Sequence, residues 1–120
     1  MLVIEDNPDA ASSVRDLLEL TNHTVAVALS GREGIEKART FKPDVVLCDI
    51  GLPGMDGYEV ARAFRSDSDL RGSVLVALTG YAAPEDLARV REAGFDVHVA
   101  KPASPEVLEE ALSADPPKDV

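Results

Sequence analysis

Several residues of this 120-residue chain carry side chains that can bind a metal ion or a phosphate group. An acidic pair, Glu5 and Asp6, follows a short apolar run near the start, and Asp49 follows another in the middle. Thr79 and Lys101 follow two later apolar runs. Carboxylates gathered at one point repel each other unless a cation lies among them. If folding brings the acids together, they predict a divalent metal site beside a hydroxyl and an ammonium group.

The chemistry of these groups indicates which ion and which ligand the site would take. Oxygen ligands without thiolate or imidazole favour a hard ion, and Mg2+, which keeps several waters, suits such a site better than zinc. The Thr79 hydroxyl and the Lys101 ammonium are donors suited to phosphate oxygens. An ionised Asp49 can act as a nucleophile and form an acyl phosphate. Gly51, in the loop that follows, can lend its backbone carbonyl to the metal.

Short apolar runs rich in Val, Leu and Ile alternate with segments of helical spacing along the chain. The runs cover residues 1–4, 24–29, 44–48, 73–78 and 96–100. This alternation predicts an α/β fold: a doubly wound, five-stranded parallel sheet with five helices on its two faces. The first, third and fourth runs are continuously apolar, as interior strands are, whereas the second and fifth alternate, as edge strands do. The flavodoxin-like order 2-1-3-4-5 has those edges.

Local signals mark the starts of three predicted helices. Asn7 before a proline is typical of an N-cap followed by proline in the first turn. Ser30 and Glu33 have the spacing of a capping box. Asp56 stands where it can cap the third helix, and we expect it to have no part in the chemistry.

Length and composition predict one domain over residues 1–113, followed by a tail or linker at residues 114–120. The net charge of -10 is the wrong sign for binding nucleic acid or an anionic membrane. One cysteine, Cys48, cannot form an internal disulfide, and with no signal peptide this favours the cytoplasm. The first strand is expected in the sheet interior yet starts at residue 1, so we expect a piece cut from a longer parent.

Taken together, these motifs resemble the receiver domain of two-component response regulators over nearly the whole chain. The resemblance is carried by Glu5-Asp6, the stretch 48–57, the Thr79-Gly80 step and Lys101-Pro102, which occur in the order found in the family. It implies that Asp49 accepts a phosphoryl group from the phosphohistidine of a histidine kinase or a histidine phosphotransfer protein.

The resemblance also implies a role for each surrounding residue. Asp6, Asp49 and the Gly51 carbonyl would bind Mg2+ directly, and Glu5 would act mainly through water. Two further residues, Thr79 and Lys101, would contact the phosphoryl group.

The resemblance also implies roles for Pro102 and His98. The peptide bond between Lys101 and Pro102 would be cis, which proline makes accessible. Phosphorylation would change the surface formed by helix four, strand five and helix five through an aromatic side chain on strand five. His98 stands at that position in place of the commoner Tyr or Phe, so it is the switch candidate, and we expect it to be partly buried. Histidine there is similar to receivers of hybrid sensor histidine kinases, which predicts a fused kinase core upstream.

An enzyme of another class uses similar residues. Phosphatases of the haloacid dehalogenase type also combine a nucleophilic Asp, a Thr or Ser, a Lys and Mg2+. Their second acid, two residues after the nucleophile, is missing, because Gly51 stands at that position. We therefore expect a phosphoryl-accepting signalling domain and no turnover enzyme. A constitutive binding module with an inactive pocket is a third alternative, with little support.

Overall fold

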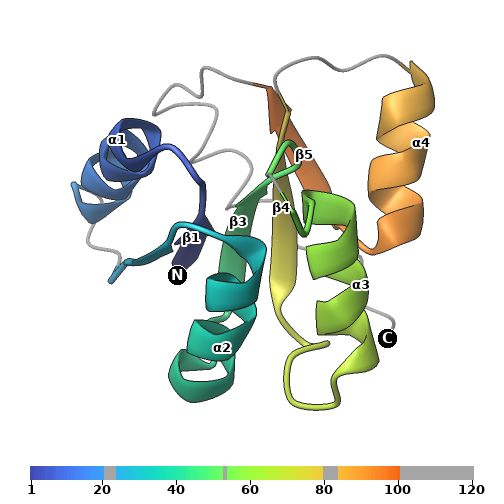
Figure 1. Ribbon diagram of the computed structural model, residues 1–120, viewed down its shortest axis with the longest axis horizontal. Coiled ribbons are helices and arrows are strands. Elements are labelled where there is room, and N and C mark those ends of the chain that lie inside the picture. The colour runs from blue at the N-terminus through green and yellow to red at the C-terminus, as the bar shows by residue number, and fades with distance from the viewer. Residues whose placement is uncertain (21–23, 53, 80–83, 101–120) are drawn as a thin grey trace.

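A five-stranded parallel sheet forms the centre of the computed structural model, which describes residues 1–20, 24–52, 54–79 and 84–100. The strand order is β2-β1-β3-β4-β5, which confirms the predicted fold and both edge strands (Figure 1). The strands are β1 (Leu2–Ile4), β2 (Ala26–Ala28), β3 (Val45–Asp49), β4 (Val74–Thr79) and β5 (Val97–Ala100). The helices in the described part are α1 (Pro8–Glu19), α2 (Gly31–Phe41), α3 (Gly57–Ser66) and α4 (Pro84–Ala93).

Helices cover both faces of this sheet. Buried residues of α2, α3 and α4 share one hydrophobic cluster with β1, β3 and β4, whereas α1 packs with residues of the opposite face. The interior strands β1, β3 and β4 are almost fully buried, as their continuous apolar runs predict. The predicted fifth helix and the tail lie outside the described residues, and no described helix has the length and apolar character of a bilayer-spanning segment.

The predicted helix caps form with one difference. The Asn7 side chain accepts backbone N–H bonds in the first turn of α1, and the Asp56 carboxylate accepts one from the start of α3. Ser30 Oγ accepts the Glu33 N–H at 3.1 Å, as in a capping box. The Glu33 carboxylate, however, bonds to the N–H of Leu29 at 2.7 Å, the residue before the cap, instead of to Ser30.

At the amino-terminal ends of β4 and β5, one side chain of α3 bonds to four residues. The Arg65 guanidinium, on α3, donates to the carbonyls of Arg71, Ser73 and Gly94 at 2.7 to 2.8 Å and to the Asp96 carboxylate at 2.8 Å. Asp96 in turn accepts the backbone N–H of β4 at its second residue. These bonds fasten the end of α3 to the turn between α4 and β5.

A second contact joins α3 to α4. The guanidinium carbon of Arg89 lies 4.5 Å from the centre of the Tyr58 ring, within the range of a cation–π interaction. Tyr58 itself is buried at the start of α3.

Candidate functional site

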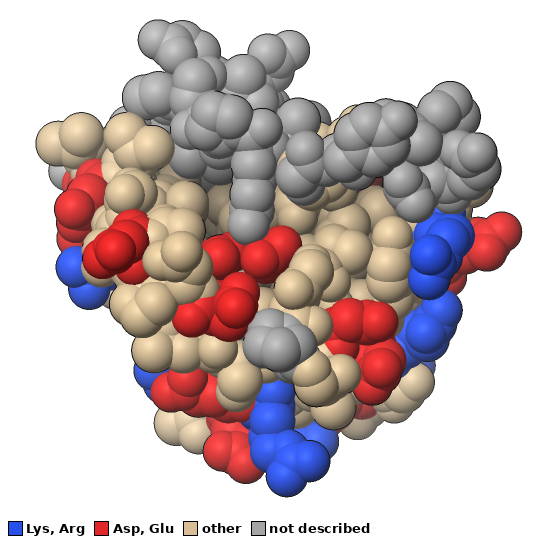
Figure 2. Space-filling model, turned by 45° about the horizontal axis from the view of Figure 1, so that its top comes forward, with Lys and Arg blue, Asp and Glu red and all other residues tan. Residues whose placement is uncertain are grey.

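The predicted acids meet at the carboxyl ends of β1 and β3, which are neighbours in the sheet. Ile4 pairs with Cys48 in the register, so the residues that follow them, Glu5 and Asp49, start from adjacent positions. Carboxylate oxygens of Glu5, Asp6 and Asp49 all lie within 4.8 Å of one another. Acidic side chains gather over the middle of this face, with Lys and Arg near its margin (Figure 2).

The three acids differ in their exposure. Asp49 and Glu5 are 7% and 3% exposed, whereas Asp6 reaches solvent. The backbone N–H of Glu5 bonds to the Ala28 carbonyl of β2, and one Glu5 oxygen lies 3.4 Å from the Asn7 nitrogen, which donates to it. Burial and mutual repulsion both disfavour ionised carboxylates, and a cation bound among them would offset both effects.

The orientation of Asp49 is held by its own loop. Oδ1 accepts the backbone N–H of Gly51 at 3.0 Å, and the next backbone N–H, of Ile50, donates to the Leu78 carbonyl of β4. The Ile50 carbonyl accepts the N–H of Gly57, which ties the loop to the start of α3. These bonds hold both the backbone and the carboxylate of Asp49 in one orientation.

Gly57, to which the sequence motifs assign no role, completes this loop. A Cβ on Gly57 would lie 2.6 Å from the Ile50 Cα and 2.7 Å from the Asp49 carbonyl oxygen. Both distances are shorter than any side-chain carbon tolerates, so only glycine lets α3 begin so near the acid. The residue type was visible in the sequence, but nothing there indicated what would approach it.

Thr79 ends β4 one residue beyond the position that pairs with Asp49. Its side chain is buried, and its hydroxyl lies 3.5 Å from the Val99 carbonyl of β5, to which it donates. The structure thus brings Thr79 to the predicted edge of the sheet, with its hydroxyl turned to β5. Lys101 and Pro102 lie outside the described residues, as does any cis bond between them.

The side chain of Cys48, next to Asp49 in the chain, is fully buried. Its sulfur lies 3.4 Å from the Asp49 carbonyl oxygen. Burial, together with the nearby charges of Asp49 and Glu5, raises the pKa of the Cys48 thiol far above its ordinary value. The thiol is therefore a packing group and no nucleophile at neutral pH.

The expectation of a partly buried His98 was wrong. Its side chain is exposed on β5, whereas Val99 beside it is buried. Alternation along β5 separates these two neighbours: Val99 packs in the cluster with α1, whereas His98 pairs with Ala77 on the opposite face, which also carries α4. Among the described elements β5 is an edge strand, and His98 stays exposed there beside α4.

Comparison with known proteins gives the site its context. The family model of the response regulator receiver domain matches residues 1–113. The chain belongs to this family. The receiver domain is a signalling domain of two-component systems, and membership removes the reason to consider a haloacid dehalogenase phosphatase.

Relatives and solved structures agree with the receiver family. The chain is 34% identical over 104 residues to the polar-differentiation response regulator DivK of Brucella ovis, covering 87% of this chain and 85% of that protein. The fold is similar to the chemotaxis response regulator CheY4 of Vibrio cholerae, with TM-score 0.87, 29% identity and 92% of each chain covered. It is also similar to the receiver domain of a signal transduction histidine kinase from Syntrophus aciditrophicus, with TM-score 0.82, 32% identity, and 91% and 83% covered.

Proposed function

We propose that this receiver domain takes a phosphoryl group onto Asp49 from a phosphohistidine, with Mg2+ as its cofactor. The observation that carries the proposal is the convergence of Glu5, Asp6 and Asp49 within 4.8 Å at the carboxyl ends of two neighbouring strands. Asp49 is the member of the cluster on the central strand β3. The residue after it, Ile50, is hydrogen-bonded to β4 and to the start of α3.

The donor set fits Mg2+. The cluster offers carboxylate oxygens alone, two from buried residues and one from an exposed residue, which leaves a solvent side for the waters that this ion retains. Asp6, Asp49 and the Gly51 carbonyl would hold the ion directly, and Glu5 would act mainly through water. When bound, Mg2+ supplies positive charge that offsets the charge of the acids and of the phosphoryl oxygens.

The chain's own residues then account for the transfer. An Asp49 carboxylate oxygen forms a bond to phosphorus while the bond from phosphorus to the donor imidazole nitrogen breaks. The electron pair of that bond stays with the imidazole. The N–H of Gly51, bonded to Oδ1, holds the carboxylate in one orientation during the attack.

Two further donors would bind the transferred group. Lys101 would place its ammonium beside the phosphoryl oxygens, and Thr79 would turn its hydroxyl toward them. That turn breaks the hydroxyl's bond to the Val99 carbonyl, so it alters β5 next to His98. The change would reach partners through the surface formed by α4, β5 and the helix expected after β5, with His98 as the switch residue.

The partners follow from this chemistry. The donor would be a histidine kinase or a histidine phosphotransfer protein in the cytoplasm, and the domain would act without turnover on a separate substrate. Similarity to the receiver of a histidine kinase supports an origin in a hybrid kinase, with a kinase core upstream. Residues 1–113 would form the domain and residues 114–120 its tail.

The test uses a small phosphodonor. With acetyl phosphate and Mg2+, intact-mass spectrometry should show one added phosphoryl group, and Asp49→Asn should abolish it. Asp56→Asn is the matched control: it removes the same charge from the same loop, and Asn also caps helices well, so labelling should persist. Labelling of the Asp49→Asn chain equal to that of the unaltered chain would refute the assignment.

A further inference from the structure

The outer edge of β2 presents backbone groups to solvent. Ala26 donates to the Met1 carbonyl and Ala28 accepts the Glu5 N–H, so both residues direct their backbone groups to β1. Because these groups alternate along a strand, the backbone groups of Val27 and Leu29 face away from the sheet. Such an edge is a template for pairing with a strand of another chain.

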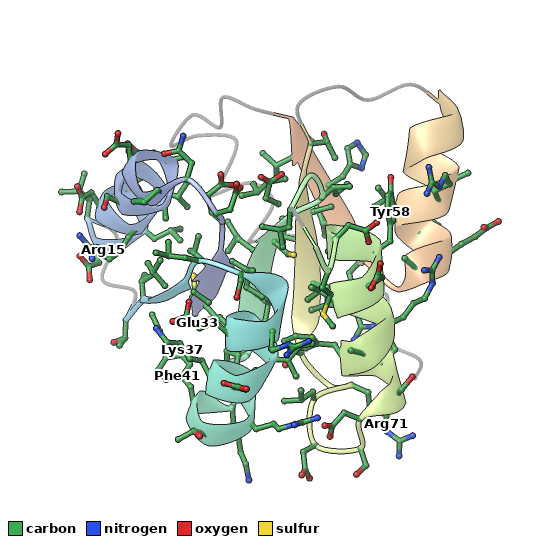
Figure 3. All side chains as sticks on the ribbon, viewed as in Figure 1. Arg15, Glu33, Lys37, Phe41, Tyr58 and Arg71 are labelled. Atoms are coloured by element: carbon green, nitrogen blue, oxygen red, sulfur yellow. The ribbon has the colours of Figure 1, made fainter. Side chains whose placement is uncertain are left out.

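Two side chains of α2 occupy this edge. Lys37 donates through Nζ to the Val27 carbonyl, and the Leu29 N–H donates to Glu33 Oε1 at 2.7 Å. The other Glu33 oxygen lies 3.5 Å from Lys37 Nζ, so the two form an ion pair one helical turn apart. The hydrogen bond from Leu29 lowers the pKa of the Glu33 carboxyl. Figure 3 shows Glu33 and Lys37 together on the side of α2 that carries Phe41.

Apolar surface surrounds this pair. A hollow of about 520 Å³ lies beside it, lined by Ala26, Glu36, Lys37, Thr40 and Phe41. Phe41 and Leu29 remain 39% and 43% exposed. A strand added to β2 would cover part of this surface, so association would gain from apolar burial as well as from hydrogen bonds.

We propose that Glu33 and Lys37 keep the β2 edge from pairing with β2 of a second copy of this chain. In an antiparallel pair about a two-fold axis through Val27, each Val27 exchanges N–H and carbonyl bonds with its counterpart. The Leu29 N–H of each copy then reaches the Val25 carbonyl of the other. The groups that this pairing needs, the Val27 carbonyl and the Leu29 N–H, are the ones that Lys37 and Glu33 hold.

The test removes the ammonium and keeps the apolar stem, with Lys37→Met. Arg15→Met is its matched control, because it loses the same charge from another exposed i,i+4 pair, on α1 (Figure 3). Sedimentation velocity without Mg2+ or phosphodonor keeps the result separate from the proposed phosphorylation. We expect Lys37→Met to self-associate at least about tenfold more tightly than Arg15→Met, because each of the two copies frees one Val27 carbonyl. Equal association of the two variants would overturn the proposal.

Amide exchange locates any dimer that forms. In associated Lys37→Met, the Val27 N–H should exchange more slowly than in the monomer; unchanged exchange there would mean another interface and would overturn the proposal too. Lys37→Arg keeps a cationic donor and should associate as weakly as the unaltered chain. If Lys37→Met does not fold, Lys37→Gln is measured in the same way, since its shorter amide still frees the Val27 carbonyl.

Discussion

Gly57 lies against the backbone of Asp49 so closely that a Cβ on residue 57 would stand 2.7 Å from the Asp49 carbonyl oxygen. The N–H of the same glycine bonds to the Ile50 carbonyl at 3.0 Å. The start of α3 therefore packs directly against the backbone of Asp49 and helps to fix its position. The position of Asp49 depends on a residue that carries no functional group.

Replacing Gly57 by alanine should disturb both stability and the site. The new methyl group meets backbone atoms that cannot move aside, and overpacking of this kind costs about 1 to 3 kcal/mol. Urea unfolding measures the loss, and phosphorylation by acetyl phosphate should slow in the same variant. Gly72→Ala is the control, because a Cβ there meets nothing within 4 Å. If both variants retain the stability of the unaltered chain, Gly57 does not support the site.

Magnesium should stabilise the folded chain through the acidic cluster. An ion that binds only the native state at 100 times its dissociation constant adds about 2.7 kcal/mol. Asp49→Asn should remove most of this gain and, without Mg2+, should raise the melting temperature because it relieves repulsion among the acids. Asp9→Asn loses the same charge from an exposed position on α1 and should keep the magnesium response. Thermal unfolding with and without Mg2+ measures the increase in melting temperature for each variant. An equal increase in Asp49→Asn and Asp9→Asn would contradict a magnesium site at Asp49.

The buried Cys48 thiol should make stability fall at alkaline pH. Its pKa is raised by burial in the folded chain, whereas the unfolded thiol titrates near about 8.5. Above that pH the unfolded state loses a proton that the native state keeps, so the free energy of unfolding falls by about 1.4 kcal/mol per pH unit. Cys48→Ala lacks this contribution. The difference in unfolding free energy between the two chains should therefore change between pH 8 and 10, and a constant difference would contradict the raised pKa.

Arg65→Lys should destabilise the fold strongly. A lysine cannot reproduce the planar set of donors that reaches three carbonyls and the Asp96 carboxylate, and the unsatisfied partners cost about 2 to 4 kcal/mol together. Arg62→Lys, at an exposed position of the same helix, should change the unfolding free energy by less than about 0.5 kcal/mol. Denaturant unfolding of the two variants measures this difference. Equal midpoints would show that the Arg65 hydrogen bonds make no net contribution to the free energy of unfolding.

The edge strands and the acidic cluster could be predicted from the apolar pattern, whereas the order of the three inner strands was taken from a common doubly wound arrangement. Continuous and alternating apolar runs distinguish interior from edge strands, and residues after the strands of a parallel sheet meet at one end. Glu5 and Asp49 come together for that reason. Local capping by Asn7 and Asp56 was equally accessible, since it depends on neighbours in the chain.

Contacts between distant segments could not be predicted in this way. The four hydrogen bonds of Arg65 and the close approach of Gly57 depend on which helix ends meet, and residue spacing does not contain that information. The carboxylate of Glu33 had two local donors within reach, Leu29 and Ser30, and residue spacing alone does not decide between them. His98 was misjudged because alternation shows that two neighbours differ in environment but leaves open which one is covered.

Arg65 holds Gly94, just after α4, and Tyr58 contacts Arg89 within α4, so both described attachments to α3 lie at Arg89 or beyond it. An opening of the first turn of α4 would leave both attachments intact.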